Sequence, residues 1–364
     1  MEEWKIYRIG DLFSHFKSGK GIKADEITPN GDYPVFGGNG LRGYTSRYNF
    51  EGDCAIIGRQ GAFCGNVRYF KGKAYMTEHA IIAIANDNNN TRFLAYLLGV
   101  MKLGRFSGQS AQPGLAVSEL AKQLISVPAL SLQNKIASIL SSLDDKIELN
   151  RRLNDNLAAL LQTIYQQEFG DVDSAFEEGK LSDICSYSKD RIAVSSLDVW
   201  SYYSTENMLP GKLGATEATN LPTTTQTTAC HVGDTLISNI RPYFKKIVYC
   251  QRECGCSTDV LCFTPFHANY SAYLFSTLYS DSFFNFMVAG SKGTKMPRGD
   301  KQQIMTYPIA LPSNDELNTF NSAAFPILAQ IHSNQIENER LSTLRDNLLP
   351  KFMSGEIDVS SVKL

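Results

Sequence analysis

The chain has 364 residues, 43% of them hydrophobic and 20% charged, which is typical of a soluble globular protein of two or three domains. No stretch approaches the ~18 uninterrupted apolar residues of a membrane span, and the acidic N-terminus, residues 1–5, lacks the apolar core of a secretory signal. The eight cysteines lack the spacing of small secreted domains and indicate free thiols. We therefore expect a cytoplasmic protein without membrane association.

The net charge of −2 argues at first against nucleic-acid binding, but the charge is unevenly distributed. Residues 1–130 carry 15 Lys and Arg against 11 Asp and Glu, and residues 181–312 carry 11 against 10. Residues 131–180 carry 5 against 9, and residues 313–364 carry 4 against 7. Two long segments are thus mildly basic and two short ones acidic. This pattern fits either a polyanion-binding face or chance variation, and charge alone does not decide between them.

The chain repeats itself at the distance of a whole domain. Two sets of residues match at a constant offset of 184: Ile147, Asn150, Asn154, Leu157, Leu160 and Ile164, and Ile331, Asn334, Asn338, Leu341, Leu344 and Leu348. Earlier matches follow in the same order: Gly52-Asp53 followed by Ala55-Ile56-Ile57 with Gly233-Asp234 followed by Leu236-Ile237 at an offset of 181, Ile9–Leu12 with Leu181–Ile184, and Val127-Pro128 with Tyr307-Pro308. The sequence therefore predicts a tandem duplication of a globular segment followed by a helix.

Each helix of the duplication is predicted from its apolar spacing. Residues 133–169 contain no Gly or Pro and place apolar residues three and four apart, which is typical of an amphipathic helix about 55 Å long. The second helix is expected from Phe325 or Leu328 to Leu349, with Pro326 in its first turn. Each contains two Asn residues on its apolar side, and Asn in a coiled-coil core fixes register.

We expect the two helices to pair as an antiparallel coiled coil with pseudo-two-fold symmetry. The predicted pairing residues are Ile136, Leu143, Ile147, Asn150, Asn154, Leu157, Leu160, Ile164, Ile331, Asn334, Asn338, Leu341, Leu344 and Leu348. The alternative is that the Asn residues lie on the helix flanks. The fold class is α+β, with four segments: residues 1–130 and 171–315 as the globular domains, residues 131–170 as the first helix, and residues 316–364 as the second helix and tail.

The globular segments combine β-rich runs with glycine-rich loops. Strands are predicted at residues 33–36, 54–57, 80–84, 235–237, 246–249 and 260–263, and helices near residues 92–102 and 271–286. A strongly bent sheet with covering helices fits this order. The loops carry Arg, Gln and Asn, which suit base edges, and Lys, which suits phosphates.

These loop residues are the candidate DNA contacts: for any single one a solvated surface charge is the better explanation, but their clustering beside glycine-rich turns favours DNA. They are Arg42, Arg47, Arg59, Gln60, Arg105, Gln109, Asn239, Arg241, Tyr243, Lys245, Lys292, Lys295 and Arg298. The loop 58–61 aligns with the loop 239–242, and their residues differ. Similar scaffolds with different loops are what two readers of different sequences need.

Catalytic motifs are weak or absent. The loop Gly38–Gly43 fits G-x-G-x-x-G, but the residues after it do not favour the helix that a nucleotide loop requires. Glu178–Lys180 is a fragment of a nuclease motif in an expected linker, and the cysteines at 250–262 lack a usual zinc spacing. His79 has no accompanying nucleophile motif. We expect a non-catalytic chain that binds no metal or cofactor itself.

Residues 132–150, with the strand and Pro at 126–130 before them, resemble the first conserved helix of type I restriction-modification specificity subunits. The tandem order of recognition domain and helix and the tail at 355–358 also resemble this family, across essentially the whole chain. The resemblance implies two target recognition domains that read a bipartite, asymmetric site on double-stranded DNA, with the helix pair setting the spacer.

The resemblance also implies partners. Two methyltransferase subunits would use S-adenosylmethionine to methylate adenine, and two translocating nuclease subunits would supply ATP- and Mg-dependent restriction in phage defence. Outward contacts for the methyltransferase are expected at Leu149, Arg151, Arg152 and Tyr165. Two alternatives remain: a self-contained enzyme that holds a nucleotide or S-adenosylmethionine at Gly38–Gly43, and a coiled-coil scaffold that binds only proteins.

Overall fold

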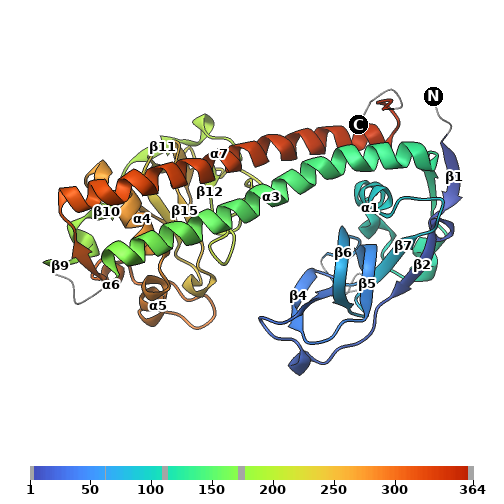
Figure 1. Ribbon diagram of the computed structural model, residues 1–364, viewed down its shortest axis with the longest axis horizontal. Helices are drawn as coiled ribbons and strands as arrows, with labels where there is room; N and C mark the ends of the chain where they lie inside the picture. Colours follow the sequence, from blue (N-terminus) through green and yellow to red (C-terminus); the bar gives the residue numbers. More distant parts are fainter. Residues whose placement is uncertain (1–3, 62, 109–113, 171–176, 360–364) are drawn as a thin grey trace. The chain divides into compact units, whose positions relative to one another are not determined.

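A computed structural model describes residues 4–61, 63–108, 114–170 and 177–359. The chain divides into two compact units. Unit 1 comprises Met1–Ile147 with Arg340–Leu364, and unit 2 comprises Glu148–Glu339. The long helices α3 (Leu130–Phe169) and α7 (Asn314–Met353) each contribute to both units (Figure 1). No helix in the described ranges has the length and apolarity needed to span a membrane.

Unit 1 is built around a bent, mostly antiparallel sheet with the strand order β2-β7-β5-β6-β3-β4. Its strands are β2 (Phe13–Ser18), β3 (Tyr33–Gly37), β4 (Gly40–Thr45), β5 (Phe50–Gly58), β6 (Val67–Met76) and β7 (Ala80–Ala85). A separate ribbon pairs β1 (Lys5–Arg8) with β8 (Leu124–Val127), and the short helices are α1 (Thr91–Val100) and α2 (Val117–Ala121). Helix α1 packs on β5, β6 and β7 (Figure 1).

The main core of unit 1 joins the two ends of the chain. Alternate residues of β5 and β7, the apolar face of α1, and Ile136 and Leu140 of α3 are buried together. Phe352 and Met353 of α7 are buried in the same core. Burial of each such side chain contributes about 1.5–3 kcal/mol, so the C-terminal end of α7 is a structural part of unit 1.

Unit 2 combines two small sheets with the orders β10-β17-β14-β15 and β11-β13-β16-β12 and a ribbon of β9 with β18. The strands are β9 (Glu177–Lys180), β10 (Cys185–Tyr187), β11 (Arg191–Ala193), β12 (Tyr202–Tyr203), β13 (Gln226–Cys230), β14 (Thr235–Ser238), β15 (Ile247–Tyr249), β16 (Cys254–Cys256), β17 (Val260–Pro265) and β18 (Pro308–Leu311). The helices are α4 (Ser271–Tyr279), α5 (Asp281–Ala289) and α6 (Lys301–Ile304). One helix was predicted over residues 271–286. Ser280 divides it because its side chain accepts from the backbone N–H of Phe283 and caps α5.

The strand register confirms the duplication and corrects its alignment. In unit 1, β5 pairs Ala55 with Ala83, whereas in unit 2 β14 pairs Thr235 with Phe263. The same equivalence holds along β6 and β15, so the central strands correspond at an offset of 180. The predicted offset of 181 was therefore wrong by one residue. Likewise β8 corresponds to β18 at an offset of 184, so Val127-Pro128 matches Leu311-Pro312 and not Tyr307-Pro308.

Both long helices contain 40 residues and start 184 positions apart. The first was predicted within three residues of its start, but α7 begins at Asn314, well before the expected Phe325 or Leu328. An interior Pro such as Pro326 costs about 3 kcal/mol. Burial of Leu317, Phe320 and Leu328 in the core of unit 2 outweighs this cost, at about 1.5–3 kcal/mol each.

In unit 2 the two helices pair antiparallel through the predicted Asn residues. Asn150 Nδ2 donates to Asn338 Oδ1 at 3.0 Å, and Asn334 Nδ2 donates to Asn154 Oδ1 at 2.7 Å. Asn334 is the repeat equivalent of Asn150, and Asn154 is the repeat equivalent of Asn338, both at the offset of 184. The two hydrogen bonds are therefore equivalent. The Asn ladder therefore has local two-fold symmetry, and Asn150 and Asn334 are buried rather than placed on the flank.

Two predicted pairing residues do not lie in the helix interface. Leu160 and its equivalent Leu344 are 49% and 47% exposed. The inward stripe of α3 runs instead through Leu157, Leu161 and Ile164, at steps of four and three, with Leu161 fully buried. Leu160 lies beside this stripe, and that is why the prediction is wrong for this pair.

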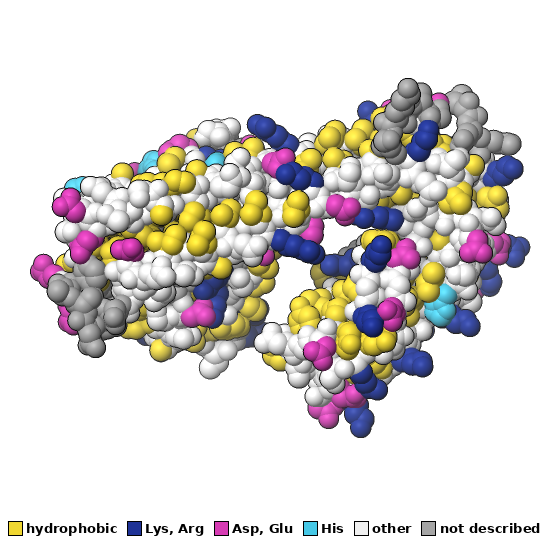
Figure 2. Space-filling model, in the orientation of Figure 1, with side chains coloured by type: hydrophobic (Ala, Val, Ile, Leu, Met, Phe, Trp, Pro, Cys, Tyr) yellow, Lys and Arg dark blue, Asp and Glu magenta, His cyan; other side chains and the backbone are white. Residues whose placement is uncertain are grey.

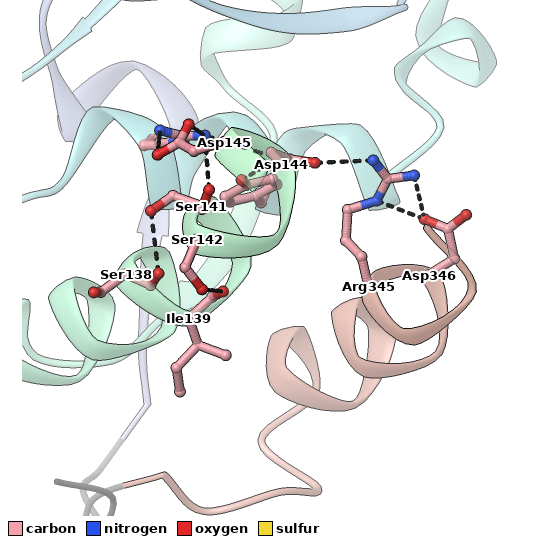
Figure 3. Close-up of polar contacts among 10 residues, drawn as sticks. Ser138, Ile139, Ser141, Ser142, Asp144, Asp145, Arg345 and Asp346 are labelled. Atoms are coloured by element: carbon pink, nitrogen blue, oxygen red, sulfur yellow. Dashed lines mark hydrogen bonds and ion pairs between the residues drawn. The ribbon is translucent and has the colours of Figure 1, made fainter. Parts of the chain in front are cut away.

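In unit 1 the helices meet at a polar cluster (Figure 3). Arg345 of α7 donates to Asp144 of α3 at 2.9 Å and is paired with Asp346 at 2.8 Å. The Tyr96 hydroxyl of α1 also donates to Asp144. Burial and this carboxylate raise the pKa of the Tyr96 phenol far above its usual value. The cluster ties α1, α3 and α7 together.

A histidine clamp joins three segments of unit 2. The His231 ring contacts Glu253 at 2.7 Å and Asp190 at 3.1 Å. These carboxylates raise the pKa of His231 above its ordinary value. The eight cysteines of the chain form no disulfide in the described ranges, as predicted, and five of them lie in the core between the two sheets of unit 2.

Candidate nucleic-acid interface

The candidate interface of unit 1 is a set of loops held together at one end of the sheet. Strand β5 ends at Gly58, and the next residue, Arg59, receives a hydrogen bond from Leu115 N and donates one to His79 O, at 2.8 and 2.9 Å. Glycine is required at two close approaches. A Cβ on Gly58 would lie 2.4 Å from Gly38 O, and one on Gly65, which has a φ of +89°, would lie 2.1 Å from Gly104 N.

The predicted DNA contacts of unit 1 differ in their availability. Gln60 and Arg42 are exposed near the loop cluster, and Arg105 is exposed with its guanidinium over the Phe106 ring. Arg59 is folded back on the protein, where its Nε donates to Leu115 O at 3.3 Å. Gln109 lies outside the described residues.

Arg47 lies away from this cluster. It follows the far end of β4, whose length from Gly40 to Thr45 is about 17 Å at ~3.3 Å per residue. Its guanidinium pairs with Glu26 and lies 5.2 Å from the centre of the Tyr75 ring. The structure therefore does not bring Arg47 together with the other candidates of unit 1.

On the face shown in Figure 2, Lys and Arg side chains of this unit alternate with Asp and Glu.

The equivalent loops of unit 2 have the same backbone arrangement. Asn239 N donates to Asp259 O at 2.8 Å, and Gly299 N donates to Asn239 O at 3.3 Å. Asn239 is thus the counterpart of Arg59, one position away from the alignment predicted from sequence. The isolated bridge between Gln60 and Gly114 in unit 1 corresponds to the bridge between Ile240 and Arg298.

Asn239 is a buried framework residue, so its side chain does not lie at the surface as a direct DNA contact would require. Its Oδ1 lies under the loop, where a Cβ on Gly299 would approach within 2.9 Å. Its polar side chain suggested a base contact. However, all four residues of the preceding strand β14 are buried, and Asn239, directly after the strand, is buried with them.

The loop after Asn239 holds two non-glycine residues in the left-handed conformation. Arg241 and Lys245 have φ values of +51° and +52° and flank the turn 242–244. Such a conformation costs about 1–2 kcal/mol per residue, and strained residues of this kind cluster at functional sites. Arg241 N donates to Pro297 O at 2.8 Å, which fixes the loop, and Tyr243 is 50% exposed at its tip.

Most of the predicted cations of unit 2 have carboxylate partners. Lys245 and Lys212 share Asp281, at 3.0 and 2.7 Å, and together lower the pKa of that carboxyl group. Arg298 pairs with Asp259 at 3.0 Å. Lys292 pairs with Asp300 at 2.6 Å. Lys295 is exposed on the same hairpin as Lys292 and Arg298.

Sequence reasoning did not place Asp259 and its unit 1 counterpart, His79, beside the loops of the candidate interface. Each lies at the entry to an equivalent strand, β7 or β17, and its backbone oxygen accepts a hydrogen bond from the loop described above. A repeat alignment at the offset of 180 pairs these two residues and could have identified them.

The predicted methyltransferase contacts on α3 are in part exposed. Leu149 is 60% exposed, and Arg151 and Arg152 are exposed, with Arg152 paired to Glu148 at 3.0 Å. Tyr165 does not point outward. Its hydroxyl bonds Thr277 at 3.0 Å and its ring contacts the aromatic core of unit 2, so the prediction of an outward contact is wrong for Tyr165.

The nucleotide-loop alternative finds no support. Gly38–Gly43 forms the turn between β3 and β4 and the first part of β4, and a strand continues to Thr45. A nucleotide fingerprint requires a helix at this point, because the helix N-terminus holds the phosphates.

Comparisons with known proteins agree with the resemblance seen in the sequence. Residues 1–159 match the family model for the type I restriction modification DNA specificity domain. The chain is 38% identical over 146 residues to the type I restriction enzyme EcoprrI specificity subunit of Escherichia coli, covering 39% of this chain and 36% of that relative. Thus the chain spans about a third of the length of this relative, and 43–47% of the lengths of three Mycoplasma specificity subunits that it also matches.

Two further similarities extend over the whole chain. The type I restriction enzyme MjaIX specificity subunit of Methanocaldococcus jannaschii is 22% identical over 425 residues, covering 99% of this chain and 95% of the relative. The crystal structure of the type I restriction-modification system S subunit from M. genitalium has a TM-score of 0.61 at 18% identity, covering 96% of each chain. The fold is thus that of a specificity subunit.

Proposed function

We propose, from the membership of residues 1–159 in the type I restriction modification DNA specificity family, that the chain is a DNA sequence-specificity subunit. It has no catalytic role of its own. Each unit reads one half of a bipartite, asymmetric site on double-stranded DNA, and the paired helices set the spacer between the halves.

The observation that carries the proposal is the pair of equivalent loop clusters. The backbone hydrogen bonds at Arg59 and Asn239 are equivalent, while the side chains around them differ. Gln60 in unit 1 corresponds to Ile240 in unit 2, and Gly61 corresponds to Arg241. Because base edges are distinguished by side-chain donors and acceptors, equivalent frames with different side chains suit two different half-sites.

The chemistry is assigned to partner subunits in the cytoplasm. Two methyltransferase subunits would bind S-adenosylmethionine and methylate adenine, and two restriction subunits would use ATP and Mg. Leu149, Arg151 and Arg152 of α3 are exposed and remain the proposed methyltransferase contacts. An exposed apolar side chain beside two basic ones suits a protein partner better than DNA phosphates alone.

The test is to map methylated adenines in DNA from cells that carry the chain with the methyltransferase of its own system. We expect one motif with two defined halves and an undefined spacer of fixed length. Arg241→Ala should relax only one half and Gln60→Ala only the other. A contiguous motif, no motif, or loss of both halves in either variant would contradict the proposal.

A second measurement separates phosphate contacts from base contacts. Removal of a phosphate contact lowers the salt dependence of binding by about one unit in the slope of log K against log salt. Lys295→Ala should show this change with the methylated motif unaltered.

A further inference from the structure

Arg298 is an exposed arginine whose position is fixed from two directions. Its backbone N donates to Lys292 O and its O accepts from Lys292 N, both at 2.9 Å. A bridge to Ile240 ties the same residue to the loop that follows β14. The side chain is 54% exposed, so the guanidinium lies at the surface on a fixed backbone.

The guanidinium itself is aimed by Asp259. One terminal nitrogen of Arg298 lies 3.0 Å from Asp259 Oδ1, at the entry to β17. Arginine has five N–H donors in a planar fork, so this single contact leaves donors free for a second planar acceptor. The backbone of Asp259 is in turn held by Asn239 N at 2.8 Å. The pair is therefore built from three segments of unit 2 that the fold brings together.

We propose that Arg298, oriented by Asp259, reads a guanine in the half-site of unit 2. This inference rests on the proposed function. Guanine presents two acceptors, O6 and N7, side by side in the major groove, and a planar guanidinium matches both. Asp259 is a positioning residue, because a fixed guanidinium loses less side-chain freedom on binding.

Unit 1 provides an internal comparison. There the counterparts of Asp259 and Arg298 are His79 and Gly114. Glycine has no side-chain donor, so this guanine contact belongs to one half-site only. A purely structural ion pair is the competing explanation for Arg298. Exposed pairs of that kind contribute little to stability, and their removal leaves base discrimination unchanged.

The experiment uses the full chain in complex with the methyltransferase of its system. Competition binding compares the wild-type motif with duplexes in which each base pair is replaced in turn. Arg298→Lys retains the charge but removes the fork, and Asp259→Asn is isosteric. Lys295→Ala, on the same hairpin, is the matched control. Thermal unfolding of each variant verifies that the complex is folded.

We expect Arg298→Lys to reduce discrimination at one G·C pair by about 5- to 150-fold, with the other positions unchanged. Asp259→Asn should reduce discrimination at the same pair by a smaller factor, and Lys295→Ala should weaken all duplexes equally. Uniform weakening by Arg298→Lys, an unchanged profile, or no G·C pair in that half-site would overturn the inference. If Arg298→Lys prevents assembly of the complex, Asp259→Asn tests the inference instead: reduced discrimination at one G·C pair supports it, and an unchanged profile or uniform weakening overturns it. A wild-type complex with no bipartite preference would instead overturn the proposed function.

Discussion

The Asn ladder between α3 and α7 gives the sharpest test of how the helices pair. In unit 2, Asn334 donates to Asn154 at 2.7 Å and accepts from Gln330 Nε2 at 2.8 Å, and it is 5% exposed. Asn334→Ala removes both hydrogen bonds, worth about 0.5–1.5 kcal/mol each, and leaves Asn154 Oδ1 without this donor, at about 1 kcal/mol or more. We expect a loss of about 2–4 kcal/mol in the free energy of unfolding of unit 2.

A double-mutant cycle isolates the hydrogen bond itself. Asn334→Leu alone should be destabilising, whereas adding Asn154→Leu should recover part of the loss, because an apolar pair leaves no buried polar group unsatisfied. The coupling energy for Asn154 and Asn334 should be about 1 kcal/mol, and the symmetric pair Asn150 and Asn338 should give the same value within about 0.5 kcal/mol.

The assay is equilibrium urea unfolding followed by tryptophan fluorescence. The chain has two tryptophans, and one lies in each unit: Trp4 in unit 1 and Trp200 in unit 2. In a Trp4→Phe background, Trp200 reports unit 2. Ser333→Ala, an exposed neighbour on the same turn, is the control and should change stability by no more than about 0.5 kcal/mol. Coupling energies below about 0.3 kcal/mol at both pairs would refute the ladder.

Three further outcomes are expected. The pKa of His231 is raised in the folded protein. Its clamp therefore stabilises unit 2 fully below the unfolded pKa of about 6.5, and this stabilisation is lost as the pH rises through the folded pKa. The urea midpoints of wild type and His231→Gln should converge at high pH, and a constant difference would contradict the clamp. Arg345→Met removes the ion pair with Asp144 and should lower unit 1 stability by about 1–3 kcal/mol, read from Trp4 fluorescence in a Trp200→Phe background. Gly65→Ala, strained at positive φ and within 2.1 Å of Gly104 N, should lower the melting temperature and relax only the half-site of unit 1; an unaltered motif would speak against the loop cluster.

Local pattern and repetition were sufficient to predict most of the fold. The strands around Cys54–Ile57, Ala80–Ile84 and Thr235–Ile237 were predicted from short apolar runs, and α3 from its apolar spacing. The start of α7 was missed because Pro326 was taken as a helix-initiating residue. The repeat offset of 184, applied to the start of α3, would have placed the start of α7 at Asn314.

The candidate interface was harder to predict because its residues meet only through the fold. Asn239 and Asp259 are 20 positions apart and Arg298 is a further 39, and no local periodicity relates them. Sequence chemistry selected Asn239 as a contact, but the inward course of β14 buries it. The prediction also grouped Arg47 with these loops, but Arg47 follows the opposite end of β4 and lies away from them.

Because the loop backbones around Arg59 and Asn239 are equivalent, the proposed guanine contact of unit 2 should be transferable to unit 1. Gly114 of unit 1 is the counterpart of Arg298, and a Cβ built on it would have Arg59 O as its nearest neighbour, at an ordinary 3.9 Å. His79 is the counterpart of Asp259. The double variant His79→Asp Gly114→Arg should therefore install the aspartate–arginine pair in unit 1.

We expect this variant to acquire a preference for guanine at one position of the unit 1 half-site, of about fivefold or more, with the unit 2 half-site unchanged. The added cation and anion cancel, so a general gain in affinity from charge is not expected. Gly114→Arg alone is the control, since an arginine without its carboxylate partner should tighten binding to all duplexes and select a base poorly. If the single and double variants behave alike in base-by-base competition, side-chain identity on a common backbone does not determine which base each unit reads.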